Sequence, residues 1–534
     1  MDKPGAHIAA SGVGPMERIS LEELHDGKSN VHQKGGSPQD EREMMRMGKN
    51  QELRRNFKFV GIVGFVTILQ STWEGVLLTN YYGLLNGGTA GVIWVTIAVW
   101  LCMLAMIASL GEMASMAPTA GGQYHWVSEF APRSFQKPLS YVVGWYCCLG
   151  WIAGIPSCGL QLASLLQEMV LLADPDSAMT EAWQVTLVVF LAIFLTVGFN
   201  IFFAHQLPLA EGMILFVHVF GFFAFLLVLW IMADHVPAEQ VFTTFNNGGG
   251  WSTQGLSCLV GLTTPIWCFI GPDAGAHMSE ELKDASLQLP RAMIWATFAN
   301  GIMGITMLIS FCFCITDLQS VFDTSNPTTV IGVIYNATQS QAGTLVLGSL
   351  LVILLFFSTV TTIASSSRQI WAFSRDRGLP FSSWIQWVRP GWDIPVNALV
   401  LCLIISIALS AINFGSQTAL NAILSISNAA LIFSYIISVG CIRLKRLRGE
   451  PLLPRRWSLG KWGWLINDIT LAFLLVAFLF CFFPEYPSVG DDNWAADFNW
   501  AIVLFAGTAV LASVYYVLGG STRYVAPITL IKDE

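Results

Sequence analysis

The sequence predicts an all-α integral membrane protein with twelve transmembrane helices. The 534 residues are 54% hydrophobic and 12% charged, which is about half the charge expected of a soluble protein. Mean hydropathy is +0.58. The apolar residues are grouped into long runs, and the Lys and Arg residues lie only in the tails and in alternate connections between the runs.

Twelve apolar runs reach the length that a helix needs to cross a bilayer, roughly 20 residues. In chain order they cover residues 57–85, 89–111, 138–172, 183–204, 208–232, 255–282, 292–316, 343–371, 393–412, 419–441, 463–484 and 497–518. Helix boundaries read from sequence carry an uncertainty of a few residues.

The distribution of basic residues predicts the orientation. With twelve crossings, all 27 Lys and Arg residues fall on one side of the membrane. Lys and Arg are retained in the cytosol, so both termini are expected there. We therefore expect a multi-pass protein of the plasma membrane. The polar start of the chain has no apolar segment typical of a cleaved signal peptide.

The two ends of the chain are predicted to lie outside the membrane domain. Residues 1–55 have too little apolar content to fold alone and predict a disordered cytosolic tail. The twelve-helix domain then covers residues 56–520, and residues 521–534 form a cytosolic C-terminal tail. A glycosylation sequon at Asn336 falls in a loop predicted to lie outside.

The first and sixth runs are interrupted by residues that disfavour a continuous helix. The first interruption consists of Gln70, Ser71, Thr72, Trp73, Glu74 and Gly75. The sixth run carries Thr264-Pro265 and then Gly271-Pro272-Asp273-Ala274-Gly275. Pro removes a backbone donor and Gly tolerates unwound backbone. Such backbone survives at membrane depth only where it is buried in protein or lines a cavity.

The positions of the two interruptions predict an inverted repeat. They fall in the first member of each of two groups of five spans, and five crossings reverse the direction of entry. This matches transporters built from inverted repeats with a substrate site near the midplane. Two extra helices complete the twelve.

The interruptions also carry the candidate binding groups. Half-helix N-termini expose N–H groups that can donate hydrogen bonds to a carboxylate. Glu74 is costly in lipid unless it is paired or faces water. We expect it to bind a cation, to carry a proton or to donate a hydrogen bond while protonated, and a structural carboxyl is the alternative. Asp273 is expected to cap a half-helix, to contact substrate, or both.

Aromatic and hydroxyl side chains extend the candidate site. Trp73, Trp267 and Phe269 adjoin the interruptions, and aromatic faces attract protonated or quaternary amines. In the eighth span a polar stripe that includes Thr362 and Ser365 either lines the pathway, holds Na⁺ or bonds between helices. His218 in the fifth span either relays protons or is a satisfied buried histidine.

Several classes of function are disfavoured. A net charge of -8 argues against nucleic acid as a partner. We find no Walker A loop, zinc motif or nucleophile elbow, so no cofactor, metal or enzyme activity is expected. The 11 Cys residues lie mostly inside apolar runs and show no paired spacing for metal or disulfides.

Three segments of the chain carry distinctive motifs. They are Ser109-Leu110-Gly111-Glu112-Met113-Ala114-Ser115 leading into Pro118-Thr119-Ala120-Gly121-Gly122-Gln123-Tyr124-His125-Trp126, then Asp273-Ala274-Gly275-Ala276-His277-Met278-Ser279-Glu280-Glu281 followed by Pro290-Arg291-Ala292-Met293, and Phe373-Ser374-Arg375-Asp376-Arg377-Gly378-Leu379-Pro380. These segments resemble the amino acid/choline transporter family, the fungal branch of the amino acid-polyamine-organocation superfamily. The resemblance runs from about residue 55 to the end of the twelfth span.

The resemblance implies a LeuT-like arrangement in which ten helices form a 5+5 inverted repeat with helices one and six broken. It implies secondary transport of choline, 4-aminobutyrate, amino acids or related solutes, usually with proton coupling. The family's substrate sites, carried over, are Gln70 to Gly75 and the segment Phe269, Ile270, Gly271 to Asp273. Glu74 departs from the apolar or small residue expected there, which hints at an extra positive charge on the substrate or at a separate proton site.

We therefore expect a secondary active transporter that moves a small nitrogenous solute by alternating access, with H⁺ as the coupling ion in preference to Na⁺. The substrate would lie between spans one, three, six and eight, with its amine near Glu74. One alternative is an exporter of a specialised fungal metabolite, such as a small alkaloid or its amino-acid precursor. A non-transporting nutrient sensor is a second alternative.

Overall fold

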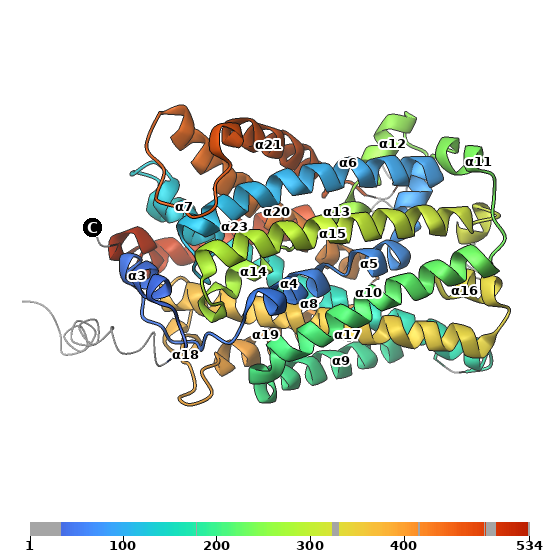
Figure 1. The fold of residues 1–534 in the computed structure, drawn as a ribbon, viewed down its shortest axis with the longest axis horizontal. Coiled ribbons are helices and arrows are strands. Elements are labelled where there is room, and N and C mark those ends of the chain that lie inside the picture. Colours follow the sequence, from blue (N-terminus) through green and yellow to red (C-terminus); the bar gives the residue numbers. More distant parts are fainter. Residues whose placement is uncertain are drawn as a thin grey trace, which may run out of the picture.

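The protein is all-helical and its twelve membrane-crossing segments run along one common axis (Figure 1). The computed structural model describes residues 34–177, 179–322, 330–414, 417–484, 486–487 and 498–531. Within these residues twelve segments are long and apolar enough to cross a membrane, which confirms the predicted count. In the described chain the only β pairing is one isolated bridge between Phe57 and Leu282.

The first five spans form the first repeat. Their helices are α4 (Phe59–Gln70) with α5 (Thr72–Leu78), α6 (Asn80–Met116), α8 (Gln136–Ala173), α9 (Ala182–Phe202) and α10 (Leu207–Met232). The helix α6 begins earlier than predicted because it continues through a bend at Gly88. This residue has φ 68°, and a Cβ there would lie 2.6 Å from the carbonyl oxygen of Thr244, so only glycine fits.

The second repeat and the two extra helices follow. The sixth span comprises α12 (Gln254–Val260), α13 (Thr263–Phe269) and α14 (Ala274–His277). The remaining spans are α15 (Ala285–Phe313), α17 (Gln341–Arg375), α19 (Val396–Ser410), α20 (Gln417–Leu447), α21 (Gly463–Phe480) and α23 (Ala501–Tyr515). Short helices between the spans include α3 (Pro38–Arg46), α7 (Gln123–Phe130), α11 (Ala238–Thr243), α16 (Val330–Thr338) and α18 (Ser382–Ile385).

Helix packing follows the symmetry of an inverted repeat. The second spans of the two halves, α6 and α15, pack against each other, and so do the third spans, α8 and α17. The broken first span packs on α15 of the other half, and the broken sixth span packs on α6. Each broken helix is therefore held by the partner repeat, which places the two interruptions face to face near the centre of the bundle.

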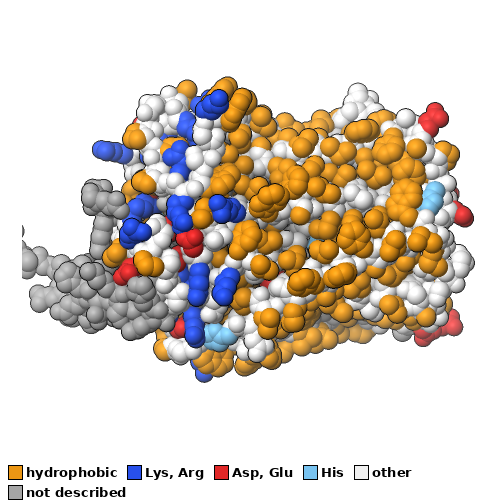
Figure 2. Space-filling view, in the orientation of Figure 1, with side chains coloured by type: hydrophobic (Ala, Val, Ile, Leu, Met, Phe, Trp, Pro, Cys, Tyr) orange, Lys and Arg blue, Asp and Glu red, His pale blue; other side chains and the backbone are white. Residues whose placement is uncertain are grey.

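Charged side chains divide between the two ends of the molecule. Lys and Arg gather at the end that carries the C-terminus and α3, whereas a few acidic side chains and no Lys or Arg are visible at the opposite end (Figures 1 and 2). Between these ends the visible surface is largely hydrophobic over the length of the helices (Figure 2). This is the pattern predicted from the alternating loops.

Residues 34–55, part of the predicted disordered tail, pack on the folded domain. Helix α3 opens with a capping box between Ser37 and Asp40. Asp40 also accepts from the backbone N–H groups of Asp284 and Ala285 at the start of α15, and it pairs with Arg55 at 3.2 Å. The segment is ordered because its polar groups find partners on the folded domain, which composition alone cannot reveal.

The C-terminal segment also packs on the domain at this end. Tyr524 is buried, and its hydroxyl lies 3.0 Å from that of Ser140. The backbone N–H of Ile528 donates to Ser128 at 2.9 Å. Residues 1–33 and 532–534 of the two predicted tails lie outside the described residues.

Candidate substrate site

Both predicted interruptions are real breaks in helices, and they contact each other. Between α4 and α5 Ser71 takes a left-handed conformation with φ 39°. In the sixth span the helix stops at Phe269, Gly271 has φ 93°, and α14 starts only at Ala274. The Gln70 amide donates to the carbonyl of Phe269 at 3.1 Å, joining the two breaks.

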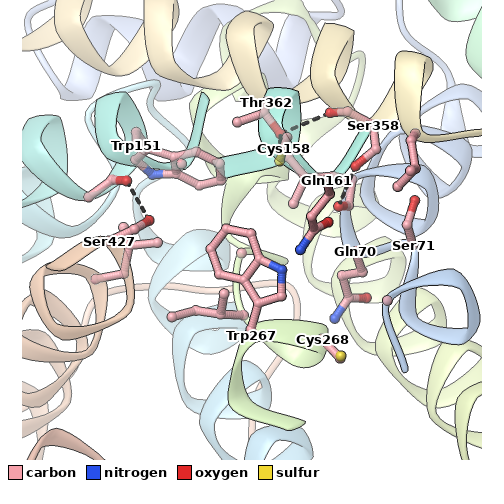
Figure 3. Close-up of a pocket in the computed structure, with 18 residues that line it drawn as sticks. Gln70, Ser71, Trp151, Cys158, Gln161, Trp267, Cys268, Ser358, Thr362 and Ser427 are labelled. Atoms are coloured by element: carbon pink, nitrogen blue, oxygen red, sulfur yellow. Dashed lines mark hydrogen bonds between the residues drawn. The ribbon is translucent and has the colours of Figure 1, made fainter. Parts of the chain in front are cut away.

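A cavity lies beside the breaks (Figure 3). It encloses about 630 Å³ of space, its opening included. Seven of the predicted residues line it: Gln70, Ser71, Gly75, Trp267, Ile270, Gly271 and Thr362. Spans one, three, six and eight contribute as expected, and α20 adds Ser427 and Leu431.

Sequence reasoning missed several side chains of the cavity wall. These are Trp151, Cys158, Gln161, Cys268 and Ser427. Gly150 and Gly154 on α8, spaced as for close packing, were the available signal. A Cβ at Gly150 would lie 2.7 Å from Leu431, so these glycines let α8 and α20 approach closely at the cavity.

The described residues of the cavity wall carry no charged side chain. Indole rings of Trp151 and Trp267 face the space together with the amides of Gln70 and Gln161 (Figure 3). Among the residues that the structure covers, no group of three or more His, Cys, Asp or Glu could hold a metal ion. The wall is thus suited to a solute held by hydrogen bonds and aromatic faces.

Seven predicted residues do not line this cavity: Thr72, Trp73, Glu74, His218, Phe269, Asp273 and Ser365. The Thr72 hydroxyl donates across the breaks to the carbonyl of Cys268 at 2.9 Å. Ser365 donates within its own helix to the carbonyl of Thr361 at 3.1 Å, and Thr362 does the same to Ser358 at 2.8 Å.

Asp273 connects three elements instead of capping α14. Its carboxylate accepts from Gln123 on α7 at 2.6 Å and from the Tyr435 hydroxyl on α20 at 2.5 Å. His277 lies 3.6 Å away. Its side chain makes no capping hydrogen bond to the described start of α14, so the capping prediction was wrong. The Asp273 side chain instead connects the sixth span to α7 and α20 by hydrogen bonds.

Glu74 and His218 form a buried pair. Glu74 Oε1 lies 2.7 Å from His218 Nδ1, and Trp73 Nε1 donates to the same nitrogen at 3.2 Å. His218 Nε2 contacts Asn300 Oδ1 at 3.2 Å. Both members of the pair are fully buried. The structure therefore separates Glu74 from the cavity and gives it a histidine partner that the sequence did not identify.

The hydrogen bonds around Glu74 and His218 indicate which atoms of the pair carry hydrogen. Asn300 donates through Nδ2 to the carbonyl of Thr67 at 3.0 Å and to Gln70 at 3.3 Å. Its oxygen must then accept, so Nε2 of His218 carries hydrogen. Because Trp73 donates to Nδ1, this nitrogen is an acceptor, and a protonated Glu74 donating to neutral His218 is consistent with both contacts. In this arrangement the pair has no net charge.

Buried ion pairs lie between the cavity and the basic end of the molecule. Two arginines of α17 lie beyond Thr362 along the helix. Arg368 pairs with Glu281 at 2.7 Å, and Arg375 makes two hydrogen bonds of 2.7–2.8 Å to Glu280. Burial acts to raise the pKa of Glu280, but Arg375 and the backbone N–H of Ala120 outweigh it and lower the pKa to about 2. Lys49 of the N-terminal segment pairs with Asp376 in the same layer.

A twelve-helix membrane bundle with an inner cavity between two broken helices defines a solute permease. A sequence profile described as amino acid permease matches residues 59–508. The chain belongs to this amino acid permease family.

Named relatives cover most of the chain. A Macrophomina phaseolina protein named as an amino acid/polyamine transporter is 31% identical over 81% of this chain and 96% of its own length. The choline transporter of Saccharomyces cerevisiae is 27% identical, covering 89% of this chain and 83% of the relative. The GABA-specific permease of the same yeast is 26% identical, covering 99% of this chain and 93% of the relative.

Proposed function

We propose that the protein is a secondary active transporter of the plasma membrane that moves a small nitrogenous solute by alternating access, coupled to protons. The observation that carries the proposal is the uncharged, indole-lined cavity between two broken helices. The names of the relatives, which include choline and GABA, support a substrate with one amine or quaternary ammonium group.

The composition of the cavity narrows the chemistry of the substrate. A dication would need at least one carboxylate to offset its desolvation, and the described wall has none. Trp151 and Trp267 can stabilise one positive charge through their ring faces. We therefore favour a monocation or a zwitterion over a polyamine.

The charge asymmetry supports the orientation. We place the basic end, with α3 and the C-terminus, in the cytosol. The ion-pair layer built by Arg368, Arg375 and Lys49 then closes the cytosolic route in this conformation. We propose import as the net direction of transport.

Uptake into proteoliposomes tests the proposal. Purified full-length protein is reconstituted, and radiolabelled choline, 4-aminobutyrate and a mixture of amino acids are offered separately. We expect one class to accumulate under an inward proton gradient and to stop when an ionophore collapses that gradient. Accumulation that instead requires Na⁺ would overturn proton coupling, and absence of uptake for every probe would overturn the proposed substrate class.

The alternative functions have less support. The hypothesis of a metabolite exporter depended on Glu74 as an unusual charge in the binding site, and Glu74 does not line the cavity. The hypothesis of a sensor, like that of an enzyme, has no supporting feature in the described residues. We therefore retain transport as the proposal.

A further inference from the structure

A second buried carboxyl, absent from the sequence predictions, lies beside the cytosolic half of the first broken helix. Glu211 on α10 is fully buried. Its Oε1 accepts a hydrogen bond from the Thr361 hydroxyl on α17 at 2.9 Å, and its Oε2 has no partner among the described atoms. Unlike Glu74, Glu211 has no ion-pair partner in the described structure.

No titratable group in the described surroundings compensates for a charge at Glu211. The helix α4 contacts the site through Gly64 and contains no ionisable residue. The elements packed against α10 are α4, α15, α16, α17 and η1 (Ala204–Gln206), and α5 contacts it through Trp73 and Glu74. The titratable and charged groups of these elements and of α10 itself, apart from Glu211, are Glu74, His205, His218, Arg291, Cys312, Tyr335, Arg368 and Arg375. Within the part of the chain that the structure describes, none of them bonds to Glu211, and both Arg368 and Arg375 are engaged by other glutamates.

The surroundings therefore favour the neutral acid. An ionised carboxyl at membrane depth costs several kcal/mol unless it is paired or reaches water. One hydroxyl donor does not replace a hydration shell. Glu211 is stable as a protonated acid in this closed conformation and can ionise only when water enters.

Water from the cytosolic side reaches Glu211 if α4 separates from α10 and α17. A Cβ at Gly64 would lie 2.8 Å from the carbonyl oxygen of Glu211, so α4 and α10 are in backbone contact. The carboxyl is also close to the cavity, because its partner Thr361 precedes the cavity residue Thr362 on α17. A movement of α4 that opens the cavity to the cytosol would expose both the substrate and this carboxyl.

We propose that Glu211 is the group that carries the coupled proton. The carboxylate binds one proton when the site faces outward, stays neutral while α4 is packed, and releases the proton when α4 opens to the cytosol. The Glu74–His218 pair, which is already neutral and internally bonded, positions the break through Asn300 and Gln70. This inference deepens the proposed function and rests on its proton coupling.

An infrared measurement tests the protonation of Glu211 without a known substrate. The difference spectrum between wild type and Glu211→Gln, recorded on purified full-length protein at about pH 7, should contain the C=O band of a protonated carboxyl, sensitive to D₂O. Glu239→Gln, at an exposed glutamate of α11, is the matched control and should remove a carboxylate band. Loss of a carboxylate band in Glu211→Gln as well would overturn the inference.

Transport measurements test the coupling. In the Glu211→Gln variant the new amide oxygen can still accept from Thr361, so substrate exchange between the two sides of proteoliposomes at equal pH should remain within about twofold of wild type. Accumulation driven by an inward proton gradient should fall by about tenfold or more, a typical coupling magnitude. Glu239→Gln, at the exposed glutamate of α11, serves as the control and should keep the response to the gradient.

The outcomes separate the inference from the proposed function. If the wild type accumulates choline, 4-aminobutyrate or amino acids to the same level with and without the proton gradient, the proposed coupling itself is wrong. If wild type responds and Glu211→Gln responds equally, only the role of Glu211 fails. Loss of exchange together with accumulation would show that Glu211 acts in folding or binding and would also overturn its assignment as the proton carrier.

Discussion

At the scale of single residues, the structure separates the groups that face the cavity from those that hold the helices. Trp267 and Gln70 face the solute space, whereas Glu74 and Asp273 are bonded to neighbouring spans. Buried polar groups at membrane depth need such partners. A charged residue next to a helix break is therefore a poor indicator of substrate contact unless its partners are known.

Trp267 provides one test at this scale. Replacing it with Ala should weaken the apparent affinity for a cationic substrate by about tenfold, since a desolvated cation–π contact contributes roughly 1–2 kcal/mol. Trp267→Phe keeps an aromatic face and should lose less. The measurement is the KM of uptake in proteoliposomes. Trp295→Ala, at a side chain that is 59% exposed, is the control and should leave KM unchanged.

Glu280 provides a second test, in the pH dependence of stability. Glu280→Gln should destabilise the protein by about 3–5 kcal/mol near neutral pH, because Arg375 stays buried without its partner. The pKa of Glu280 falls from 4.5 to about 2 on folding. Its contribution is thus complete above about pH 4.5 and is lost as the pH falls toward 2.

Thermal unfolding in detergent measures this difference. The gap between wild type and Glu280→Gln should narrow steadily as the pH is lowered through that window. Glu450→Gln is the control, because Glu450 pairs with Arg448 at the surface and its side chain is 49% exposed. It should change stability by no more than about 0.5 kcal/mol. A stability difference between wild type and Glu280→Gln that stays constant down to low pH would contradict the lowered pKa of Glu280.

At the scale of elements, glycine residues allow neighbouring helices to pack at close distance. The contact of α4 with α10 at Gly64 and that of α8 with α20 at Gly150 bring backbones together beside the cavity. A residue with a side chain at these points would push a whole helix outward. The breaks therefore depend on the packing of their neighbours as much as on their own Gly and Pro residues.

Gly64→Ala tests the α4–α10 contact. The added methyl would lie 2.8 Å from the backbone oxygen and 3.1 Å from the carbonyl carbon of Glu211. Backbone atoms cannot move aside, so we expect a loss of about 1–3 kcal/mol through overpacking. Gly198→Ala on α9, where nothing lies within 4 Å, should be neutral or slightly stabilising. Equal thermal unfolding of both variants would refute this contact.

At the scale of the whole molecule, charge and hydropathy set the orientation in the bilayer. On the face that Figure 2 shows, the visible Lys and Arg side chains lie at one end, and apolar surface covers the length of the helices. The acidic end carries α16, where Asn336 is exposed near the end of the helix. Orientation is a property of the entire chain, because every loop contributes to it.

Glycosylation of Asn336 tests the orientation. If α16 faces the outside, Asn336→Gln should increase mobility on a denaturing gel to that of the glycosidase-treated wild type. Thr338→Ser retains the sequon and should keep the glycan, which makes it the matched control. An unmodified wild type, unaffected by the glycosidase, would contradict the predicted glycan.

Sequence reasoning was most successful where local chemistry dictates structure. The twelve spans and both helix breaks were predicted because apolar length, Gly and Pro act within a single turn or span. Seven cavity residues were found for the same reason. Trp151, Ser427 and Glu211 were missed because their roles depend on residues far away in the chain.

The sequence by itself determined the class of protein, the number of crossings and the places where two helices open, because the bilayer imposes those rules on each segment separately. Only the tertiary structure decided which side chains face the cavity, that Glu74 is bonded to His218, and that residues 34–55 are ordered on the basic end. These outcomes depend on which helices are neighbours, and a buried polar group takes its role from the partner that packing brings within hydrogen-bond distance.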